Sequence, residues 1–430
     1  MLNPTVSKKL IRLKQGVWLY FLFLLFEGAL RKWFLPGLAT PLLVVRDPIA
    51  IWLIFRSIQL GLFPFNVYSF CMSVIALVSF FATLHFGHGN IYVAAYGLRI
   101  FLLHFPLIFI IARIFDRQDV IQVGKFVVWL TIPMTILIAL QFYSPQSAWV
   151  NLGVGGDTEG AGFGGALGYF RPPGTFSFTN GTAAFYGLAA PFIFYFWLHR
   201  YKLNKLVLVA ATAGLLAAIP LSISRTLFFS VCLTLLFLGI ASLYKPKYLG
   251  SMIISVFGGA LVLAALSNAP FFQTATEAFT VRFESANKTE GGMEGVLGNR
   301  YLGSMGRALS YRHGGYPFFG KGLGMGTNVG AMLLSGEKEF LVAEEEWPRI
   351  IGEMGPLLGV LTLLVRMLVS LFISISAFKK LSFGDMLPWL LLSFALINLP
   401  LGQWAQPTNL GFAIVSGALV LASVRGTHKT

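Results

Sequence analysis

The run Ala343-Glu344-Glu345-Glu346-Trp347-Pro348 closes the longest polar segment of this chain, which begins at residue 268. The segment carries nine of the chain's 17 acidic residues, together with arginines, lysines and many glycines. A polar segment of this length between structural elements is usually functional rather than a bare connection. The apolar runs on both sides of it decide the fold, and the segment itself is the first candidate for chemistry.

Composition sets the class of protein. Of 430 residues, 56% are hydrophobic, 15% aromatic and 11% charged, and the mean hydropathy is +0.74. Soluble domains carry about 25% charged residues, so a water-soluble enzyme is excluded and the sequence predicts an all-α, polytopic membrane protein. No internal repeat is visible, which argues against a secondary transporter. The net charge of +15 fits an anionic partner at a membrane surface, and nucleic acid is not expected as a partner.

About twenty apolar residues cross a bilayer as a helix, and the apolar runs predict twelve such helices. Nine fall in residues 1–267, which also hold a glycine-rich outer loop at 144–177, and three fall in residues 348–430. The polar segment 268–347 is predicted to be one large extracytoplasmic loop. The expected spans lie near residues 16–36, 40–60, 66–86, 92–112, 123–143, 178–198, 206–222, 226–244, 249–267, 349–378, 386–402 and 408–424.

Lysine and arginine set the predicted orientation. They cluster at the N-terminus and at every second boundary between spans, and these clusters hold 17 of the 32 Lys and Arg residues. Because positive residues favour the cytoplasmic side, both termini are expected in the cytoplasm. The loop 144–177, the turn Ser222–Thr226 and the segment 268–347 are then expected on the outer face.

Arginines on the outer face depart from that rule and therefore suggest a bound anion. The most distinctive are Arg171, in Arg171-Pro172-Pro173-Gly174-Thr175-Phe176, and Arg225, in a turn between two spans. Arginine binds phosphate oxygens through two parallel N–H groups, so a lipid phosphate is the expected ligand. The plainer alternatives are a surface arginine beside a helix that Thr179 and Asn180 cap, and an arginine that extends to the lipid headgroups.

The acidic run offers a candidate base. A helix is predicted to begin near Pro348 and, if continuous to Phe378, to be roughly 45 Å long. Carboxylates before a helix N-terminus are favourable for the helix dipole alone, which is the plainer interpretation. Three adjacent carboxylates also raise one another's proton affinity, which suits a general base. Four-residue spacing further predicts two ion pairs, Glu27 with Arg31 and Arg349 with Glu353.

Together these pieces resemble the O-antigen ligase/polymerase superfamily of bacterial envelope glycosyltransferases. The resemblance covers residues 120–425 and depends on the order, spacing and membrane side of four motifs. They are Arg171-Pro172-Pro173-Gly174-Thr175-Phe176 followed by Asn180, the turn Ser224-Arg225-Thr226, the stretch Pro317–Gly326, and the run Ile351–Gly359. The N-terminal run Glu27–Trp33 loosely resembles the subgroup of exopolysaccharide and capsule polymerases.

The resemblance implies an inverting transferase with an all-helical fold. Its donor would be a glycan on undecaprenyl pyrophosphate, used at the outer face of the bacterial inner membrane without nucleotide sugar, metal or other cofactor. Two arginines of the family hold the pyrophosphate, and their positions match Arg171 and Arg225, with Arg312 in the large loop as a third candidate. Expected partners are the lipid-linked donor and acceptor, membrane lipids, and the flippase and chain-length or export proteins of the same process.

The resemblance also implies a base. The family usually has a histidine eleven residues before the glycine of its Glu-x-Gly signature, here Gly355, and this chain has Glu344 at that place. Glu344 is therefore the expected catalytic base. Glu346 is the second candidate, because alternate residues of an extended chain face the same side. The departure from histidine favours a repeat-unit polymerase over a ligase.

Other classes of function stay open at this point. A ligase would transfer the same glycan to a lipid or protein acceptor. A flippase for lipid-linked oligosaccharides would have a similar number of spans, but its charges would line a central cavity. A multispan peptidoglycan polymerase uses the same carrier lipid with different motifs, and a scaffold of a secretion complex needs no catalytic site.

Overall fold

The computed structural model describes residues 4–160, 162–199, 203–246, 249–290, 317–337 and 341–425, and the single positions 303, 306 and 308. The predicted all-α class is confirmed there, since the one β contact among these residues is an isolated bridge between Gly164 and Phe170. The helices are α1 (Pro4–Ala29), α2 (Asp47–Gln59), α3 (Val67–Phe86), α4 (Ile91–Arg99), α5 (Leu107–Ile114), α6 (Arg117–Tyr143), α7 (Thr179–Leu198), α8 (Lys205–Leu221), α9 (Arg225–Tyr244), α10 (Leu249–Ser267), α11 (Pro270–Glu290), α14 (Asn328–Ser335), α15 (Glu346–Ser382), α16 (Leu387–Leu401) and α17 (Pro407–Val424).

Eight helical stretches of the described chain are long and apolar enough to cross a membrane, so this is a multi-pass membrane protein. They are Lys8–Phe34, Val67–Phe86, Ile91–Ile114, Arg117–Tyr143, Thr179–Leu198, Arg225–Tyr244, Glu346–Ser382 and Pro407–Val424. Each of the twelve predicted spans overlaps a helix. The four that fall outside the eight overlap α2, α8, α10 and α16, and α8, α16 and the Phe257–Ser267 part of α10 are apolar but shorter.

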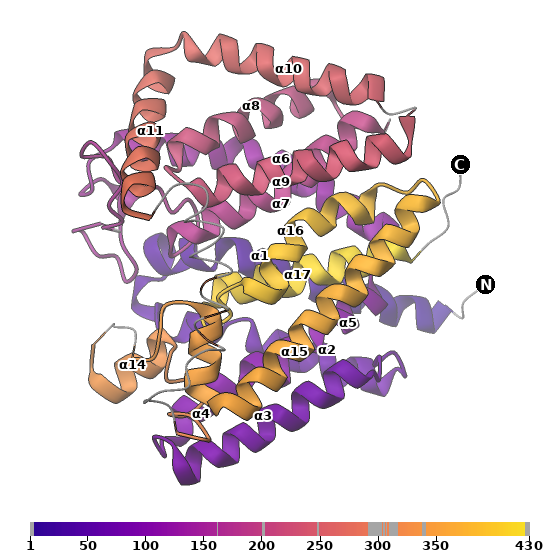
Figure 1. Ribbon diagram of the computed structural model, residues 1–430, viewed down its shortest axis with the longest axis vertical. Coiled ribbons are helices and arrows are strands. Elements are labelled where there is room, and N and C mark those ends of the chain that lie inside the picture. Colours follow the sequence, from indigo (N-terminus) through magenta and orange to yellow (C-terminus); the bar gives the residue numbers. More distant parts are fainter. Residues whose placement is uncertain are drawn as a thin grey trace.

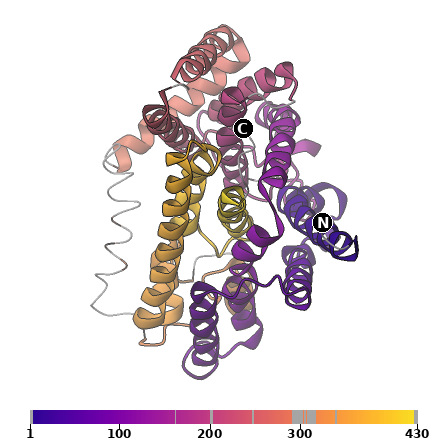
Figure 2. The same cartoon turned by 90° about the vertical axis from the view of Figure 1, so that its right-hand side faces the viewer.

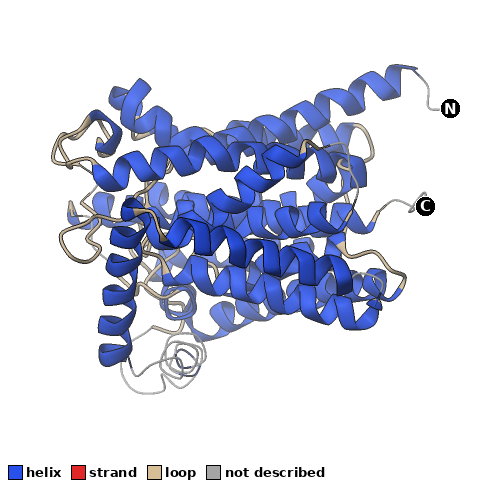
Figure 3. Ribbon diagram, turned by 90° about the horizontal axis from the view of Figure 1, so that it is seen from above, coloured by secondary structure: helices blue, strands red, loops and turns tan. Residues whose placement is uncertain are grey.

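The helices run side by side in one bundle, with both termini at one end and the long loops at the other (Figures 1 and 3). α17 lies inside the bundle, where it contacts α5, α7, α15 and α16 (Figure 2). Its apolar window is 72% buried, whereas that of α3 at the periphery is 39% buried. α11 lies across the loop end at a steep angle to the bundle and contacts α8 (Figures 1 and 3).

The second predicted span, 40–60, is shorter than expected. Pro36 and Pro41 each begin a single 3₁₀ turn, and α2 begins only at Asp47. Proline favours the first position of a helical turn and disfavours a helix through the residue before it, so two prolines five residues apart divide this region into short turns. The chain is held there by a partly buried ion pair, in which Arg99 donates to Asp47 at 2.8 Å.

The helix after the acidic run differs from the prediction in two ways. It begins at Glu346, so the last glutamate of the run is its first residue rather than a residue before it. It is also not continuous, because Gly355 has φ 77° and ψ 170° and the chain kinks there. This backbone conformation is essentially restricted to glycine, and Pro356 follows it without an N–H group.

The kink leaves two carbonyl groups without their helical donors, and the glycine-rich stretch 317–326 supplies replacements. In a regular helix the Gly352 carbonyl would accept from residue 356, which is proline and has no N–H group, and the Glu353 carbonyl would accept from Leu357. The N–H of Lys321 donates to the Gly352 carbonyl at 2.8 Å, and the N–H of Gly322 donates to the Glu353 carbonyl at 3.0 Å. Two of the sequence motifs are therefore joined main chain to main chain.

We predict that Gly355→Ala lowers the thermal unfolding midpoint of the purified protein in detergent. A methyl group at Gly355 would lie 2.0 Å from the Phe318 carbonyl oxygen, and the backbone strain alone costs about 1–3 kcal/mol. Gly239→Ala in α9 is the matched control, because nothing lies within 4 Å of its added carbon and alanine favours a helix. An unchanged midpoint for Gly355→Ala would contradict the role assigned to the kink.

Candidate functional site

The functional segments predicted from sequence lie together at the loop end of the bundle, opposite the termini (Figures 1 and 3). They are the loop 144–177, the turn Ser222–Thr226 and the described part of the segment 268–347. The turn 402–406 before α17, which was not predicted to be functional, lies at the same end. Arg312 lies outside the described residues. The contacts below connect these segments to one another.

Arg171 is carried by a rigid turn. The two residues after it, Pro172 and Pro173, have φ fixed by their rings. Gly174 follows with φ 59°, a conformation that favours glycine. Gln141 at the end of α6 holds Gly174 on both sides. Its side-chain oxygen accepts from the Gly174 N–H at 2.8 Å, and its side-chain nitrogen donates to the Gly174 carbonyl at 3.2 Å.

The same turn is docked on α1. The Thr175 hydroxyl donates to a main-chain carbonyl of α1 at 2.6 Å, and Arg31, just beyond α1, donates to the Ser177 hydroxyl at 2.9 Å. Gly28 allows the two chains to approach, because a Cβ there would lie 2.4 Å from the Ser177 nitrogen. Arg31 also pairs with Glu27 at 3.5 Å, which confirms the predicted pair.

Thr179 and Asn180 do not cap α7, contrary to the prediction. α7 begins at Thr179 after Phe178, without a side-chain cap. The Asn180 amide instead donates to the side-chain oxygen of Gln406, which also accepts from Asn409 at 3.3 Å. Because the starts of α7 and α17 lie next to each other, this amide joins two helices rather than ending one.

Arg225 is the first residue of α9 and follows a strained turn. Ser224 caps the helix by accepting from the Leu227 N–H at 3.3 Å. Ile223 has φ 47°, a costly conformation for a β-branched residue that persists only where surrounding structure enforces it. Its buried side chain packs against Gly165, where a Cβ would lie 2.6 Å from it. The Arg225 turn is thus in contact with the loop that carries Arg171.

α11 covers this side of the loop end. Arg282 donates to the Gly165 carbonyl at 3.1 Å. The rings of Phe279 and Phe283 lie 6.1 and 6.2 Å from that of Phe228 in the first turn of α9. The loop at Gly165, α9 and α11 surround the Arg225 turn, and these contacts hold the three elements together.

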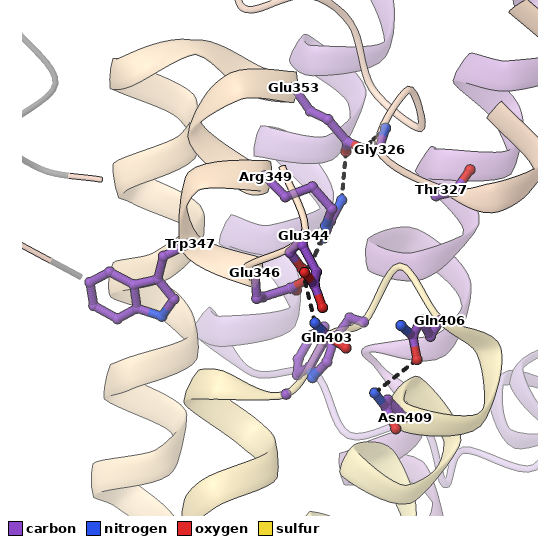
Figure 4. Close-up of polar contacts among 12 residues, drawn as sticks. Gly326, Thr327, Glu344, Glu346, Trp347, Arg349, Glu353, Gln403, Gln406 and Asn409 are labelled. Atoms are coloured by element: carbon purple, nitrogen blue, oxygen red, sulfur yellow. Dashed lines mark hydrogen bonds and ion pairs between the residues drawn. The ribbon is translucent and has the colours of Figure 1, made fainter. Parts of the chain in front are cut away.

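Glu346 is the centre of a buried ion network (Figure 4). Its two carboxylate oxygens each accept from Arg349 at 3.0 Å, and one also accepts from Arg366 at 2.5 Å. Arg349 pairs with Glu353 at 2.7 Å, as predicted, and Glu353 accepts from the Gly326 N–H at 2.7 Å. The two carboxylates balance the two guanidinium groups, and all four side chains are buried. A balanced network of this kind fixes structure.

Arg366 extends the network to the end of α16. It donates to two carbonyl oxygens there, both at 2.9 Å, and its guanidinium lies 3.8 Å from the centre of the Trp404 ring. Trp347 donates to the Pro400 carbonyl at 3.0 Å. The last carbonyls of a helix have no partner within it, so these side chains complete the end of α16 and place the turn 402–406.

Glu344 lies beside this network at the edge of a small cleft (Figure 4). It is exposed, whereas Glu346 is 4% exposed. Its main-chain carbonyl accepts from the Gln403 side chain at 2.9 Å, and its carboxylate makes no hydrogen bond or ion pair with the described residues. Asn328 and Gln406 also line the cleft. Glu344 therefore combines a fixed main chain with an available carboxylate.

Three of these polar residues were missed by sequence reasoning. Gln403 and Gln406 lie in a short gap between the last two predicted spans. The predicted orientation places that gap on the outer face, and this is the signal that could have identified them. Gln141 ends a long apolar run, and nothing in its spacing relates it to Gly174, 33 residues later. Its role follows only from the fold.

Comparison with protein-family models, with curated proteins and with solved structures found no match for this chain. Among the described residues, no group of three or more His, Cys, Asp or Glu side chains could hold a metal ion. The features that bear on function are therefore those of the loop end itself: the Arg225 turn in contact with the loop that carries Arg171, and a carboxylate at the edge of a small cleft.

We predict that Glu346→Gln lowers the free energy of unfolding by about 3–5 kcal/mol, because it leaves Arg366 buried without its carboxylate partner. Glu344→Gln changes an exposed carboxylate and is expected to stay within about 0.5 kcal/mol of wild type. Denaturant or thermal unfolding of the purified variants measures both. Equal stability of the two variants would contradict the structural role of Glu346.

Proposed function

We propose that this chain is a membrane glycosyltransferase that polymerises lipid-linked oligosaccharide repeat units at the outer face of the bacterial inner membrane. It transfers a glycan from undecaprenyl pyrophosphate to a sugar hydroxyl of an acceptor repeat unit, and the product is an exopolysaccharide or capsule. The observation that carries the proposal is the convergence, at one end of an apolar helical bundle, of the Arg171 turn, the Arg225 turn and the cleft at Glu344.

In the proposed reaction the bond between the anomeric carbon and the pyrophosphate oxygen breaks, and the acceptor oxygen bonds to that carbon from the opposite face. Undecaprenyl pyrophosphate leaves with the electron pair of the broken bond. Arg171 and Arg225 stabilise the negative charge that develops on it, which is most effective when the donors are fixed before the reaction. The rigid turn of Arg171 and the strained turn before Arg225 supply that fixity.

Glu344 takes the proton of the acceptor hydroxyl in this proposal. Its carboxylate is exposed and makes no hydrogen bond or ion pair with the described residues, so its oxygens are available to accept a proton. Glu346 is less suited, because its oxygens already accept from two arginines. The amides of Asn328, Gln403 and Gln406 around the cleft are groups that hydrogen-bond sugar hydroxyls.

The proposal includes the membrane arrangement: twelve spans, both termini in the cytoplasm, and the loop end outside. The placement of both termini at the end opposite the candidate site supports it. The helices α8 and α16 are short for a span. They are counted as spans in this arrangement because they are apolar, and buried side chains complete the end of α16.

We predict that reporter insertions at Glu337 and at Lys380 report opposite sides of the membrane. Glu337 follows α14 at the loop end, and Lys380 lies in the last turn of α15. An alkaline phosphatase reporter should be active at Glu337 and inactive at Lys380, with a fluorescent reporter giving the converse. The same side for both would remove the basis for an outer-face reaction.

We predict that Glu344→Gln keeps donor binding and loses turnover by about 10²–10⁴-fold, the usual contribution of a general base. Arg171→Lys and Arg225→Lys should lose turnover as well, because an ammonium does not reproduce the two-pronged contact of a guanidinium. The assay uses purified protein and a synthetic polyprenyl-pyrophosphate oligosaccharide, which serves as both donor and acceptor.

One matched control is Glu337→Gln, which changes an exposed carboxylate at the same end of the bundle. The other is Arg56→Lys in α2, because among the described residues the Arg56 side chain donates only to the nearby Gln59. Both should retain wild-type turnover. A ladder of products indicates a polymerase, and single transfer to an added lipid acceptor indicates a ligase. Wild-type turnover in Glu344→Gln would overturn the assignment of the base.

A further inference from the structure

Lys32 is a buried cation in the candidate span that begins at Lys8. Its side chain is 1% exposed, and no carboxylate of the described residues lies within ion-pair distance of its nitrogen. The ammonium donates to the Gly174 carbonyl at 2.6 Å and lies 4.4 Å from the centre of the Trp33 ring. The neighbouring Glu27 pairs instead with Arg31 and Arg46, each at 3.5 Å.

A lysine in such a place is costly to keep. Burying a charge without an opposite charge carries a penalty that one carbonyl and one aromatic face offset only in part. Ionisable residues inside an apolar span are accordingly functional more often than structural. An apolar side chain of similar length would fill the same volume without that cost, so the retained charge calls for a functional reason.

The contact that Lys32 makes points to that reason. Gly174 follows Arg171 with only Pro172 and Pro173 between them, and both prolines have fixed φ. The position of Gly174 therefore restricts the position of the Arg171 main chain. Gln141 holds the same glycine from the α6 side, and Lys32 holds it from the α1 side.

We propose that Lys32 is a positioning residue for Arg171, which it holds in place through Gly174 for binding a polyprenyl pyrophosphate. The inference rests on the proposed function and adds to it a residue of the N-terminal segment. Lys32 does not itself contact the anion, since its nitrogen is covered by the turn that it holds. Its contribution passes through Arg171 and disappears when Arg171 is removed.

The test measures binding of farnesyl pyrophosphate to the purified full-length protein by calorimetry, with farnesol as the uncharged comparison. Lys32→Met should raise the dissociation constant about tenfold or more, the scale of a hydrogen bond made by a charged group. Lys32→Arg keeps a charged donor and should bind within about threefold of wild type. Lys14→Met is the matched control, because Lys14 lies on α1 at the opposite end and pairs with Asp116 and Asp119 at 2.9 and 2.6 Å.

Two further measurements separate positioning from a structural role. The unfolding midpoint of Lys32→Met should equal or exceed that of wild type, because a buried unpaired charge has been removed. In the background of Arg171→Ala, adding Lys32→Met should change the dissociation constant by less than about twofold, since residues acting as one unit are not additive. Loss of stability that parallels loss of binding, or full additivity, would overturn the inference.

The outcomes also separate this inference from the proposed function. Wild-type binding in Lys32→Met, with pyrophosphate preferred over farnesol, overturns the role of Lys32 and leaves the proposed function standing. Equal binding of farnesyl pyrophosphate and farnesol by the wild-type protein removes both. A Lys32→Met variant that does not fold, beside a folded Lys14→Met, assigns Lys32 to the structure and overturns the inference.

Discussion

Every buried main-chain N–H and carbonyl needs a hydrogen-bond partner, and at the loop end of this bundle several of those partners come from outside the helix that needs them. Helices kink, end or turn there, and each departure leaves carbonyls without helical donors. The kink of α15 is completed by the glycine-rich stretch, the end of α16 by Arg366 and Trp347, and the turn after Arg171 by Gln141 and Lys32. The glycine-rich stretch is itself part of the candidate site, and the other donors hold the turns that form it.

Buried charge is organised in two contrasting ways at this end. Around Glu346 the charges balance and every member has a partner from the opposite sign, so the network acts as a brace between α15 and α16. Around α1 the cations outnumber the carboxylates, with one glutamate between two arginines and a lysine that has only a carbonyl and a ring. The loop end thus holds both a charge-balanced network and a cluster with excess positive charge.

The sequence predicted the all-α class and the approximate positions of the apolar helices, because apolar runs and their polar boundaries are local features. It did not predict α11 and α14, which lie in the segment expected to be a loop. It also paired Arg349 with Glu353 and Glu27 with Arg31, since four-residue spacing puts both members on one helix face. It was wrong about capping by Asn180 and about a continuous helix to residue 378. Both outcomes depend on partners far along the chain, Gln406 in one case and the stretch 317–326 in the other. Spacing alone gives no access to such partners. The sequence ranked Glu344 above Glu346 by its distance from Gly355, and the engagement of Glu346 by Arg366, 20 residues further on, became apparent only from the fold.

The main-chain hydrogen bonds between the α15 kink and the glycine-rich stretch bear on which positions of the sequence can vary. The two are joined by main-chain atoms, so the geometry depends on glycine at a few positions and on proline at one. Side chains that project from the stretch, such as the exposed Phe318, are not part of that joint. The side chains on the surface of this loop can therefore change while the kink beneath it keeps its shape. Among natural variants, the glycines and the proline of the joint should change most slowly.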